Sequence, residues 1–296
     1  MKIKALFFAT FFLLGVVSSY ANNPSLFSDS IQKGRVVLVS SSLALVVGGS
    51  YYYVQNAWWN EKQIAFHFDN GSDKVYALNV DKAGHFLGGL QAADLFASSM
   101  LWAGMNEKKA LWYGGFFGSA LQLAIEVKDG YAPYWGFSKE DLIIGSIGAF
   151  LPIAQHYSPT LNAFDVKFSY WKSHNTYWDL EQQRGKTPYK YAWQDDYVNQ
   201  TYWLSIDIHH FYEKFPDWLN IAIGFGLDET QYLNANNTKV GGNNEWYIAL
   251  DYDLPQMLKK YNSPLAKKVK HWLNYFHFPA PTIRIAPKTD FYPLFL

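Results

Sequence analysis

The sequence contains no cysteine, and its charged residues are few. The absence of Cys from all 296 residues excludes disulfide bonds, a thiol nucleophile and lipid attachment through an N-terminal cysteine. Charged side chains make up 17% of the chain, below the roughly 25% usual for soluble domains. Because 25 basic residues balance 25 acidic ones, no net charge attracts nucleic acid, and no Gly-rich phosphate loop indicates a nucleotide. We therefore expect neither a nucleic-acid partner nor a nucleotide partner.

Aromatic residues, by contrast, are abundant. They account for 19% of the chain, with 22 Tyr, 22 Phe and 12 Trp. Amphipathic rings are stable at the level of lipid headgroups. The composition therefore favours a protein that lies against a membrane, and it makes a membrane lipid or an envelope protein the expected partner.

The N-terminus has the pattern of an export signal. Lys2 and Lys4 precede an apolar run over residues 5–17, and Ser19-Tyr20-Ala21 places small residues around a cleavage point. This pattern predicts a secretory signal peptide over residues 1–21, cleaved after Ala21. An uncleaved anchor helix is the alternative.

Residues 22–160 are expected to form an apolar four-helix bundle domain. The first predicted helix is long enough to span a membrane, with Tyr51-Tyr52-Tyr53 and Trp58-Trp59 at one interface, although a buried bundle helix fits its serines equally well. Gly, Pro and Asn punctuate the other boundaries. The four helices are expected at Val36–Val54, Ala83–Trp102, Lys108–Glu126 and Lys139–His156.

Residues 161–296 are expected to form an antiparallel β-rich domain, which makes the fold class α+β. Apolar and mostly polar residues alternate with period two, and Asn, Asp and Gly fill the turns. Five strands are too few for a transmembrane barrel, which needs at least about eight, so we expect an open antiparallel meander. The strands are predicted at Phe164–Trp171, Thr201–Tyr212, Leu219–Asp228, Glu245–Leu254 and Thr282–Ala286.

One amphipathic helix is expected to interrupt this sheet. Apolar residues follow helical spacing, and lysines flank them. Such a helix suits an anionic membrane surface, or it packs its apolar stripe on the sheet. The stripe consists of Leu265, Val269, Trp272, Leu273 and Phe276, and the lysines are Lys267, Lys268 and Lys270.

Three of the bundle helices combine a stripe of small residues with polar residues on the same face. Such stripes permit close contact between helices. Contact through them would bring His85, Gln122, Glu126 and Asp141 to one region. A buried Glu beside a His has a shifted protonation equilibrium, so His85, Glu126 and Asp141 are the hypothetical catalytic residues. The stripes are His85-Gly88-Gly89-Ala92, Gly114-Gly118-Gln122-Glu126 and Asp141-Gly145-Gly148-Ala149.

The other polar residues near these helices have binding roles or structural roles. Asp81, Lys82, Gln122 and Asp129 are the predicted binding residues, and Lys82 with Lys128 could hold a lipid phosphate. Asp81 also suits an N-cap, and Asp129-Gly130 a turn. Ser138-x-x-Asp141 resembles a capping box.

Metal binding is not predicted by the spacing of these residues. Histidine and carboxylates are ordinary ligands, but no His-x-x-x-His or Glu-x-x-His pair occurs. No nucleophile stands out either. We therefore expect no metal site, and the sequence identifies no cofactor.

The ordered motifs resemble the YfiM-like family, a group of predicted periplasmic lipoproteins of unknown function. These motifs are Asp81-Lys82-x-x-His85-Phe86, Glu126-x-x-Asp129-Gly130 and Trp135-Gly136-Phe137-Ser138-x-x-Asp141, with Gly148 and Gln155 beyond. The strand-rich second half is similar to members from the Bacteroidetes, through residues 200–205 and 218–222. A short likeness links the Asp-Lys-x-x-His and Ser-x-x-Asp elements to VanZ-like membrane proteins. The resemblance implies the periplasm, outer membrane or membrane-associated envelope of a Gram-negative bacterium, and it implies no activity.

Three functions follow as hypotheses. The first is a membrane-associated envelope protein that binds a lipid or an envelope partner at the His/Glu/Asp centre. The second is a membrane-bound hydrolase or transferase acting on a lipid or envelope glycan, with Glu126 and His85 as the acid–base pair. The third is a purely structural bundle, whose polar residues only specify packing.

Overall fold

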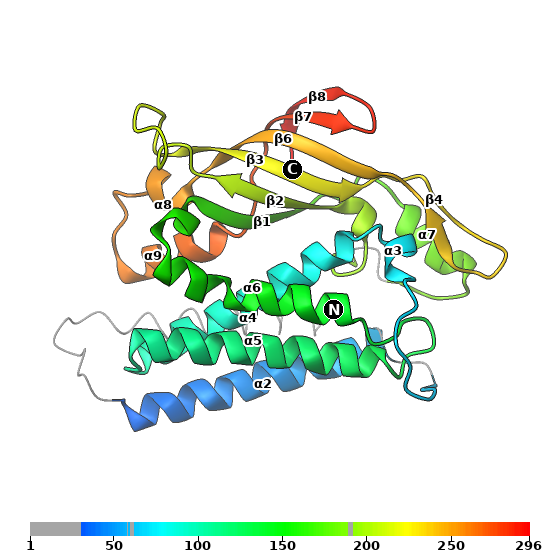
Figure 1. Cartoon of the computed structure of the whole chain (residues 1–296), viewed down its shortest axis with the longest axis horizontal. Coiled ribbons are helices and arrows are strands. Elements are labelled where there is room, and N and C mark those ends of the chain that lie inside the picture. Colours follow the sequence, from blue (N-terminus) through cyan, green and yellow to red (C-terminus); the bar gives the residue numbers. More distant parts are fainter. Residues whose placement is uncertain (1–30, 58, 60–61, 189–191) are drawn as a thin grey trace. The chain divides into compact units, whose positions relative to one another are not determined.

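The computed structural model describes residues 31–57, 59, 62–188 and 192–296. Helices dominate its first half and an antiparallel sheet its second half, which confirms the predicted α+β class (Figure 1). The expected signal peptide, residues 1–21, lies outside the described residues.

The chain divides into two compact units, and each is described by itself. The first unit contains the described residues up to Asn70, together with His85–Tyr157 and Tyr261–Val269. The second contains Gly71–Gly84, Ser158–Lys260 and Lys270–Leu296. Residues 71–84 group with the second unit, and the predicted domain boundary at residue 160 stays a prediction.

Four long helices form most of the first unit. They are α2 (Lys33–Ala57), α4 (Val80–Trp102), α5 (Glu107–Asp129) and α6 (Lys139–Tyr157), each bound lying within three residues of the predicted one. Asn106 caps α5 by accepting a hydrogen bond from the Lys109 N–H. The prediction that Asp81 caps α4 is wrong, because α4 begins at Val80 and Asp81 lies in its first turn.

Small and aliphatic residues join α2, α4 and α5. The core cluster contains Val39 and Leu43 from α2 and Ala97, Met100 and Ala110 from the other two helices. Most of α2 is nevertheless exposed, since only 11% of its Lys33–Tyr52 segment is buried. Within the described residues this is the one helix long and apolar enough to cross a membrane. Its low burial differs from that of a helix in the core of a soluble protein.

The second unit contains a six-stranded antiparallel sheet with the order β1-β2-β3-β6-β7-β8 (Figure 1). A separate two-stranded sheet pairs β4 with β5. The bounds are β1 Phe164–Tyr170, β2 Gln200–Ile206, β3 Leu219–Leu227, β4 Gln231–Leu233, β5 Lys239–Gly241, β6 Asn244–Tyr252, β7 Ala280–Ala286 and β8 Asp290–Phe295.

The five predicted strands are all present, but the prediction missed β8 and extended β2 too far. Pro293 lies in β8, and proline is tolerated there because β8 is an edge strand. β2 ends at Ile206 because the chain then turns, with Asp207 Oδ1 accepting a hydrogen bond from the His210 N–H. The β4–β5 pair was also missed.

Four shorter α-helices and two 3-10 helices complete the described elements: α3 (Asp73–Tyr76), α7 (Thr176–Gln183), α8 (Leu254–Met257), α9 (Pro264–Leu273), η3 (Pro159–Ala163) and η4 (Tyr197–Asn199). Helix α9 is the expected amphipathic helix, and its apolar residues Leu265 and Val269 are nearly half exposed. One part of that prediction is wrong. Lys270 does not face a membrane surface, because it is buried and its Nζ lies within hydrogen-bond distance of the Pro255 and Leu258 carbonyls.

Candidate functional site

Glycines allow α4, α5 and α6 to touch at backbone distance. A Cβ added at Gly89 of α4 would overlap the carbonyl oxygen of Gly145 in α6. At Gly118 of α5 an added Cβ would lie 2.7 Å from the Gly89 oxygen, and at Gly148 it would overlap the Phe86 oxygen. Real Cβ atoms do not approach backbone so closely. The three small-residue stripes therefore meet one another, and the polar residues on them are carried to one place.

Three ionisable side chains converge where these helices meet. One ring nitrogen of His85 and one carboxylate oxygen each of Glu126 and Asp141 lie within 4.8 Å of one another. Glu126 is 1% exposed and Asp141 is 4% exposed, whereas the His85 side chain is 20% exposed. We call these three residues the polar centre. Each comes from a different helix, so no local spacing in the sequence reveals the group.

Gln122 orients the histidine of the polar centre. His85 Nδ1 lies 2.8 Å from Gln122 Oε1 and 3.7 Å from Glu126 Oε1. Because an amide oxygen only accepts hydrogen bonds, Nδ1 carries the proton in this arrangement. Neutral His85 then has its lone pair on Nε2, which is the nitrogen able to bind a cation or accept a proton.

The start of α6 fixes both carboxylates. Glu126 Oε2 accepts a hydrogen bond of 2.8 Å from the backbone N–H of Ser138. Ser138 Oγ in turn accepts one of 3.2 Å from the Asp141 N–H, which is the N-cap contact predicted from Ser-x-x-Asp. One short segment therefore links Glu126 near the end of α5 to Asp141 in the first turn of α6.

An extended segment supports the loop between α5 and α6. The His67 N–H donates to the Gly130 carbonyl and the Phe137 N–H donates to the His67 carbonyl, each in an ordinary backbone hydrogen bond. A Cβ at Gly130 would strike the Phe66 ring, and a Cβ at Gly136 would strike the Asp69 backbone. The glycines of Asp129-Gly130 and Trp135-Gly136 thus allow this segment to pack closely, and the loop presents Ser138 to Glu126.

The remaining predicted binding residues lie outside the polar centre. Asp129 Oδ1 accepts a hydrogen bond of 2.6 Å from the Trp59 indole, and Lys128 Nζ lies over the Trp59 and Tyr51 rings at 5.2 and 5.6 Å. The cation of Lys128 therefore already has aromatic partners. Its role in holding a lipid phosphate stays a prediction.

Asp81 and Lys82 belong to the second unit and are both buried there. Burial raises the pKa of Tyr202, and the negative charge of Asp81 raises it further. An added Cβ at Gly84 would lie 2.9 Å from the Tyr202 hydroxyl, so this glycine admits the ring. These contacts indicate a structural role for the start of α4, while a binding role for Asp81 and Lys82 stays a prediction.

Polar side chains also gather on one face of the six-stranded sheet, which the sequence prediction missed. Lys167 Nζ and Asp251 Oδ2 form an ion pair of 2.6 Å, and both side chains are at most 1% exposed. Asp251 Oδ2 also accepts a hydrogen bond of 2.6 Å from Ser205, and Ser205 accepts one from Asn220. These partners come from β1, β2, β3 and β6, so only strand pairing brings them together.

His277 closes the same network. Its ring stacks on Trp203 with centroids 4.0 Å apart, and its Nε2 lies 3.9 Å from Asp251 Oδ1. Burial lowers the pKa of His277 to about 4, although the charge of Asp251 and a hydrogen bond to the Leu250 carbonyl act to raise it. The ring is therefore neutral at ordinary pH, and its role is in packing.

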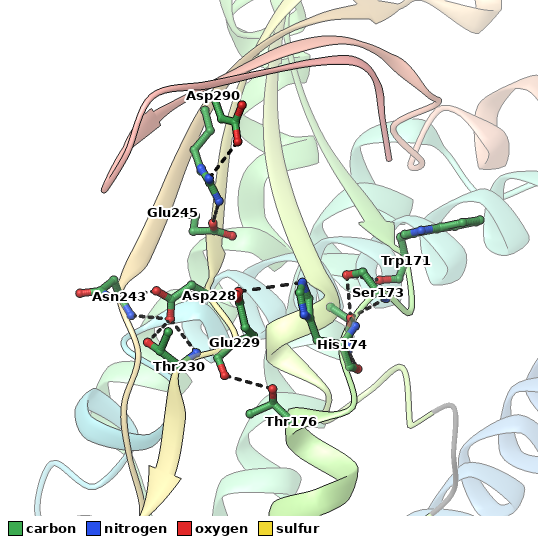
Figure 2. Close-up of polar contacts among 12 residues, drawn as sticks. Trp171, Ser173, His174, Thr176, Asp228, Glu229, Thr230, Asn243, Glu245 and Asp290 are labelled. Carbon is green, nitrogen blue, oxygen red and sulfur yellow. Dashed lines mark hydrogen bonds and ion pairs between the residues drawn. The ribbon is translucent and has the colours of Figure 1, made fainter.

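A further polar cluster orders the turn after β3 (Figure 2). Asp228 accepts hydrogen bonds from Thr230 and Asn243, and Thr176 Oγ1 donates to the Glu229 carbonyl. Burial acts to raise the pKa of Asp228, but the bonds from Asn243 and Thr230 outweigh it and lower the pKa. Figure 2 shows these contacts joining the turn to Asn243 and to Thr176 at the start of α7, so they hold separate segments together.

Part of the chain matches a known family model. Residues 68–155 match the model described as predicted periplasmic lipoprotein (DUF2279). This match supports an envelope location, and it covers the polar centre and the loop before α6. No cysteine is present in the 296 residues to carry a lipid. Neither a curated protein nor a solved structure matches the chain.

Proposed function

We propose that this chain is a membrane-associated protein of the cell envelope whose helical unit binds a divalent metal cation at the polar centre. The observation that carries the proposal is the convergence of a histidine nitrogen and two buried carboxylates within 4.8 Å. The YfiM-like and Bacteroidetes resemblance is compatible with this function but supplies no activity.

Charge decides which class of ligand suits the polar centre. Two buried carboxylates repel each other where both are negative, and a positive ion between them offsets this repulsion. A lipid phosphate would add negative charge to this centre. A cation removes the repulsion, and the close spacing of the donors suits a single ion better than a headgroup.

The donor set indicates the kind of cation. One imidazole nitrogen with two carboxylate oxygens suits first-row divalent metals such as Zn²⁺ or Mn²⁺. Tetrahedral ligands about 2.1 Å from zinc are roughly 3.4 Å apart, so donors within 4.8 Å need close by at most about 1.4 Å. Gln122 and Ser138 would hold the ligands in place, since ligating groups are usually oriented by a second hydrogen bond.

Membrane association rests on separate residues. The Lys33–Tyr52 segment of α2 is long and apolar enough to cross a bilayer, and little of it is buried. Val37 and Leu45 are among its most exposed side chains. Exposed apolar residues on a long helix are stable in lipid and costly in water.

Metal titration of the purified full chain in detergent tests the proposal. After chelation and dialysis, calorimetric titration with Zn²⁺ or Mn²⁺ should show one ion bound per chain. Glu126→Gln and Asp141→Asn each remove one ligand charge and should weaken binding at least 10-fold. Glu140→Gln makes the same kind of change at the exposed neighbour of Asp141 and should bind as wild type does.

Two results would overturn the proposal. One is a wild-type chain that binds neither ion at millimolar concentration. The other is unchanged affinity in Glu126→Gln and Asp141→Asn chains whose circular dichroism spectra match wild type. Lower melting temperatures in these variants, without any metal binding by wild type, would instead support the purely structural bundle.

The hydrolase or transferase is the second candidate. It is favoured by the 3.7 Å between His85 Nδ1 and Glu126 Oε1, which is close enough for proton exchange after a small movement. In this candidate Glu126 and His85 act as acid and base and are not metal ligands. The wild-type chain should then release product from envelope lipid or glycan, and Glu126→Gln should not. Absence of turnover in wild type would leave binding as the function.

A further inference from the structure

The six-stranded sheet has one face that is apolar and exposed. Along β2, β3, β6 and β7, most alternate side chains on this face are aliphatic or aromatic, whereas Gln200 at the start of β2 and Asn244 at the start of β6 are polar. Strand pairing puts the apolar side chains side by side, for example Ile223 opposite Ile248 and Ile248 opposite Ile283. We call this surface the outer face. Its members with 37–60% exposure are Leu204, Ile223, Trp246, Ile248, Leu250, Ile283, Ile285 and Phe291.

The opposite face of the same sheet is polar and buried. The Lys167–Asp251 ion pair lies there, together with Ser205, Asn220 and Thr282, and each of these five residues is at most 1% exposed. The sheet therefore carries this ion pair inside the second unit and the eight outer-face side chains outside.

This arrangement is the reverse of a sheet that folds against water. In a soluble antiparallel sheet the apolar face is buried and the polar face is solvated. Eight large apolar side chains gathered on one exposed face form a patch of the kind that marks contact with a partner or a membrane. Strands that face lipid show this pattern of apolar residues outside and polar residues inside.

We infer that the outer face lies against the acyl chains of a lipid bilayer. The eight outer-face residues carry no charge, and the Trp246 indole N–H is their one side-chain hydrogen-bonding group. Protein partners usually meet such a surface with about one hydrogen bond per 100–200 Å². Lipid chains require none. The other unit of the chain contains α2, a helix long and apolar enough to cross a membrane.

The sheet meets the bilayer by its face and does not span it. Open strand edges are not stable within hydrocarbon, because their backbone groups have no partners there. In this sheet both edge strands, β1 and β8, have features that reduce the number of exposed backbone groups. Phe168 of β1 exchanges backbone hydrogen bonds with Tyr275 and His277, and Pro293 removes one donor from β8. The edges would lie at headgroup level, with the outer-face side chains below them.

The absence of cysteine makes a direct test simple. Single-cysteine chains Ile248→Cys and Ile285→Cys place an environment-sensitive fluorophore on the outer face. Asn236→Cys places it in the exposed turn after β4, and Leu45→Cys places it on α2. Each labelled full-length chain is reconstituted into phosphatidylcholine–phosphatidylglycerol vesicles, and quenching is measured with acyl-chain nitroxide lipids and with aqueous iodide.

The expected result is strong quenching of positions 248 and 285 by the nitroxide lipids, with at least 3-fold protection from iodide relative to position 236. Full iodide quenching at 248 and 285 would overturn the inference. Protection from both quenchers would also overturn it, because a second copy or a protein partner would then cover the face. Lipid quenching at position 45 reports α2 separately, so failure of the sheet contact is distinguishable from failure of membrane association by the helix.

Discussion

The buried ion pair between Lys167 and Asp251 gives the sharpest prediction of stability. The Asp251→Asn substitution keeps the shape of the side chain and an acceptor for Ser205, but it removes the negative charge 2.6 Å from Lys167 Nζ. Lys167 is then a fully buried ammonium whose remaining partner is the Tyr252 carbonyl, at 2.8 Å. Breaking one partner of a buried pair typically costs about 3–5 kcal/mol, because the other charge stays buried.

A double-mutant cycle separates this charge effect from the loss of packing. Lys167→Met should also destabilise the chain, since it leaves the Asp251 carboxylate buried. The double variant Lys167→Met/Asp251→Asn contains neither charge, so its cost should be below the sum of the single costs by about 2–3 kcal/mol. Thermal unfolding of the full chain in detergent, followed by near-ultraviolet circular dichroism, measures all four members.

An exposed ion pair provides the matched control. Lys259 Nζ and Asp217 Oδ2 lie 2.7 Å apart, nearly the same distance, but both side chains are solvent-accessible. Asp217→Asn should leave the melting temperature unchanged, because water screens the pair. If Asp251→Asn lowers the melting temperature no more than Asp217→Asn does, or if the two single costs simply add, the assigned role of the buried pair is wrong.

Three further predictions follow from single side chains. His277 has a folded-state pKa of about 4 against an ordinary 6.5, so the unfolded chain takes up the proton first as pH falls. The free energy of unfolding should therefore fall by about 3 kcal/mol between pH 6.5 and pH 4. His277→Gln should flatten this pH dependence in denaturant titrations. Gly89→Ala should cost about 1–3 kcal/mol because its Cβ would overlap the Gly145 carbonyl, whereas Gly48→Ala, with nothing within 4 Å, should not lower the melting temperature. Ser138→Ala removes an N-cap acceptor and should cost about 1 kcal/mol in the same melts; no loss would argue against the cap.

Much of the helical unit follows from local pattern. The four long helices lie within three residues of their predicted bounds. A run of apolar residues favours a helix, and Asn, Gly and Pro end it, so both signals are carried by neighbouring residues in the sequence. The Ser138 cap was also predictable from its own neighbours. The expected cap at Asp81 failed because α4 extends three residues further towards the N-terminus than its apolar run indicates.

The polar centre was partly predictable. Glycine stripes placed His85, Gln122, Glu126 and Asp141 on faces that could meet, but spacing within one helix could not show three ligands at one point. Pairs of donors on one helix are the usual sequence signal of a metal site, and here each of the three donors comes from its own helix.

For the sheet, alternation alone determines that each strand has an apolar and a polar side, because successive side chains point to opposite faces. Ile221, Ile223 and Phe225 had to share one face of β3, opposite Asn220 and Ala222. Which face is buried depends on partners distant in sequence, such as Lys167 for Asp251. Only the tertiary structure therefore decided that the polar face lies inside and the apolar face outside, and that three helices bring one histidine and two carboxylates together.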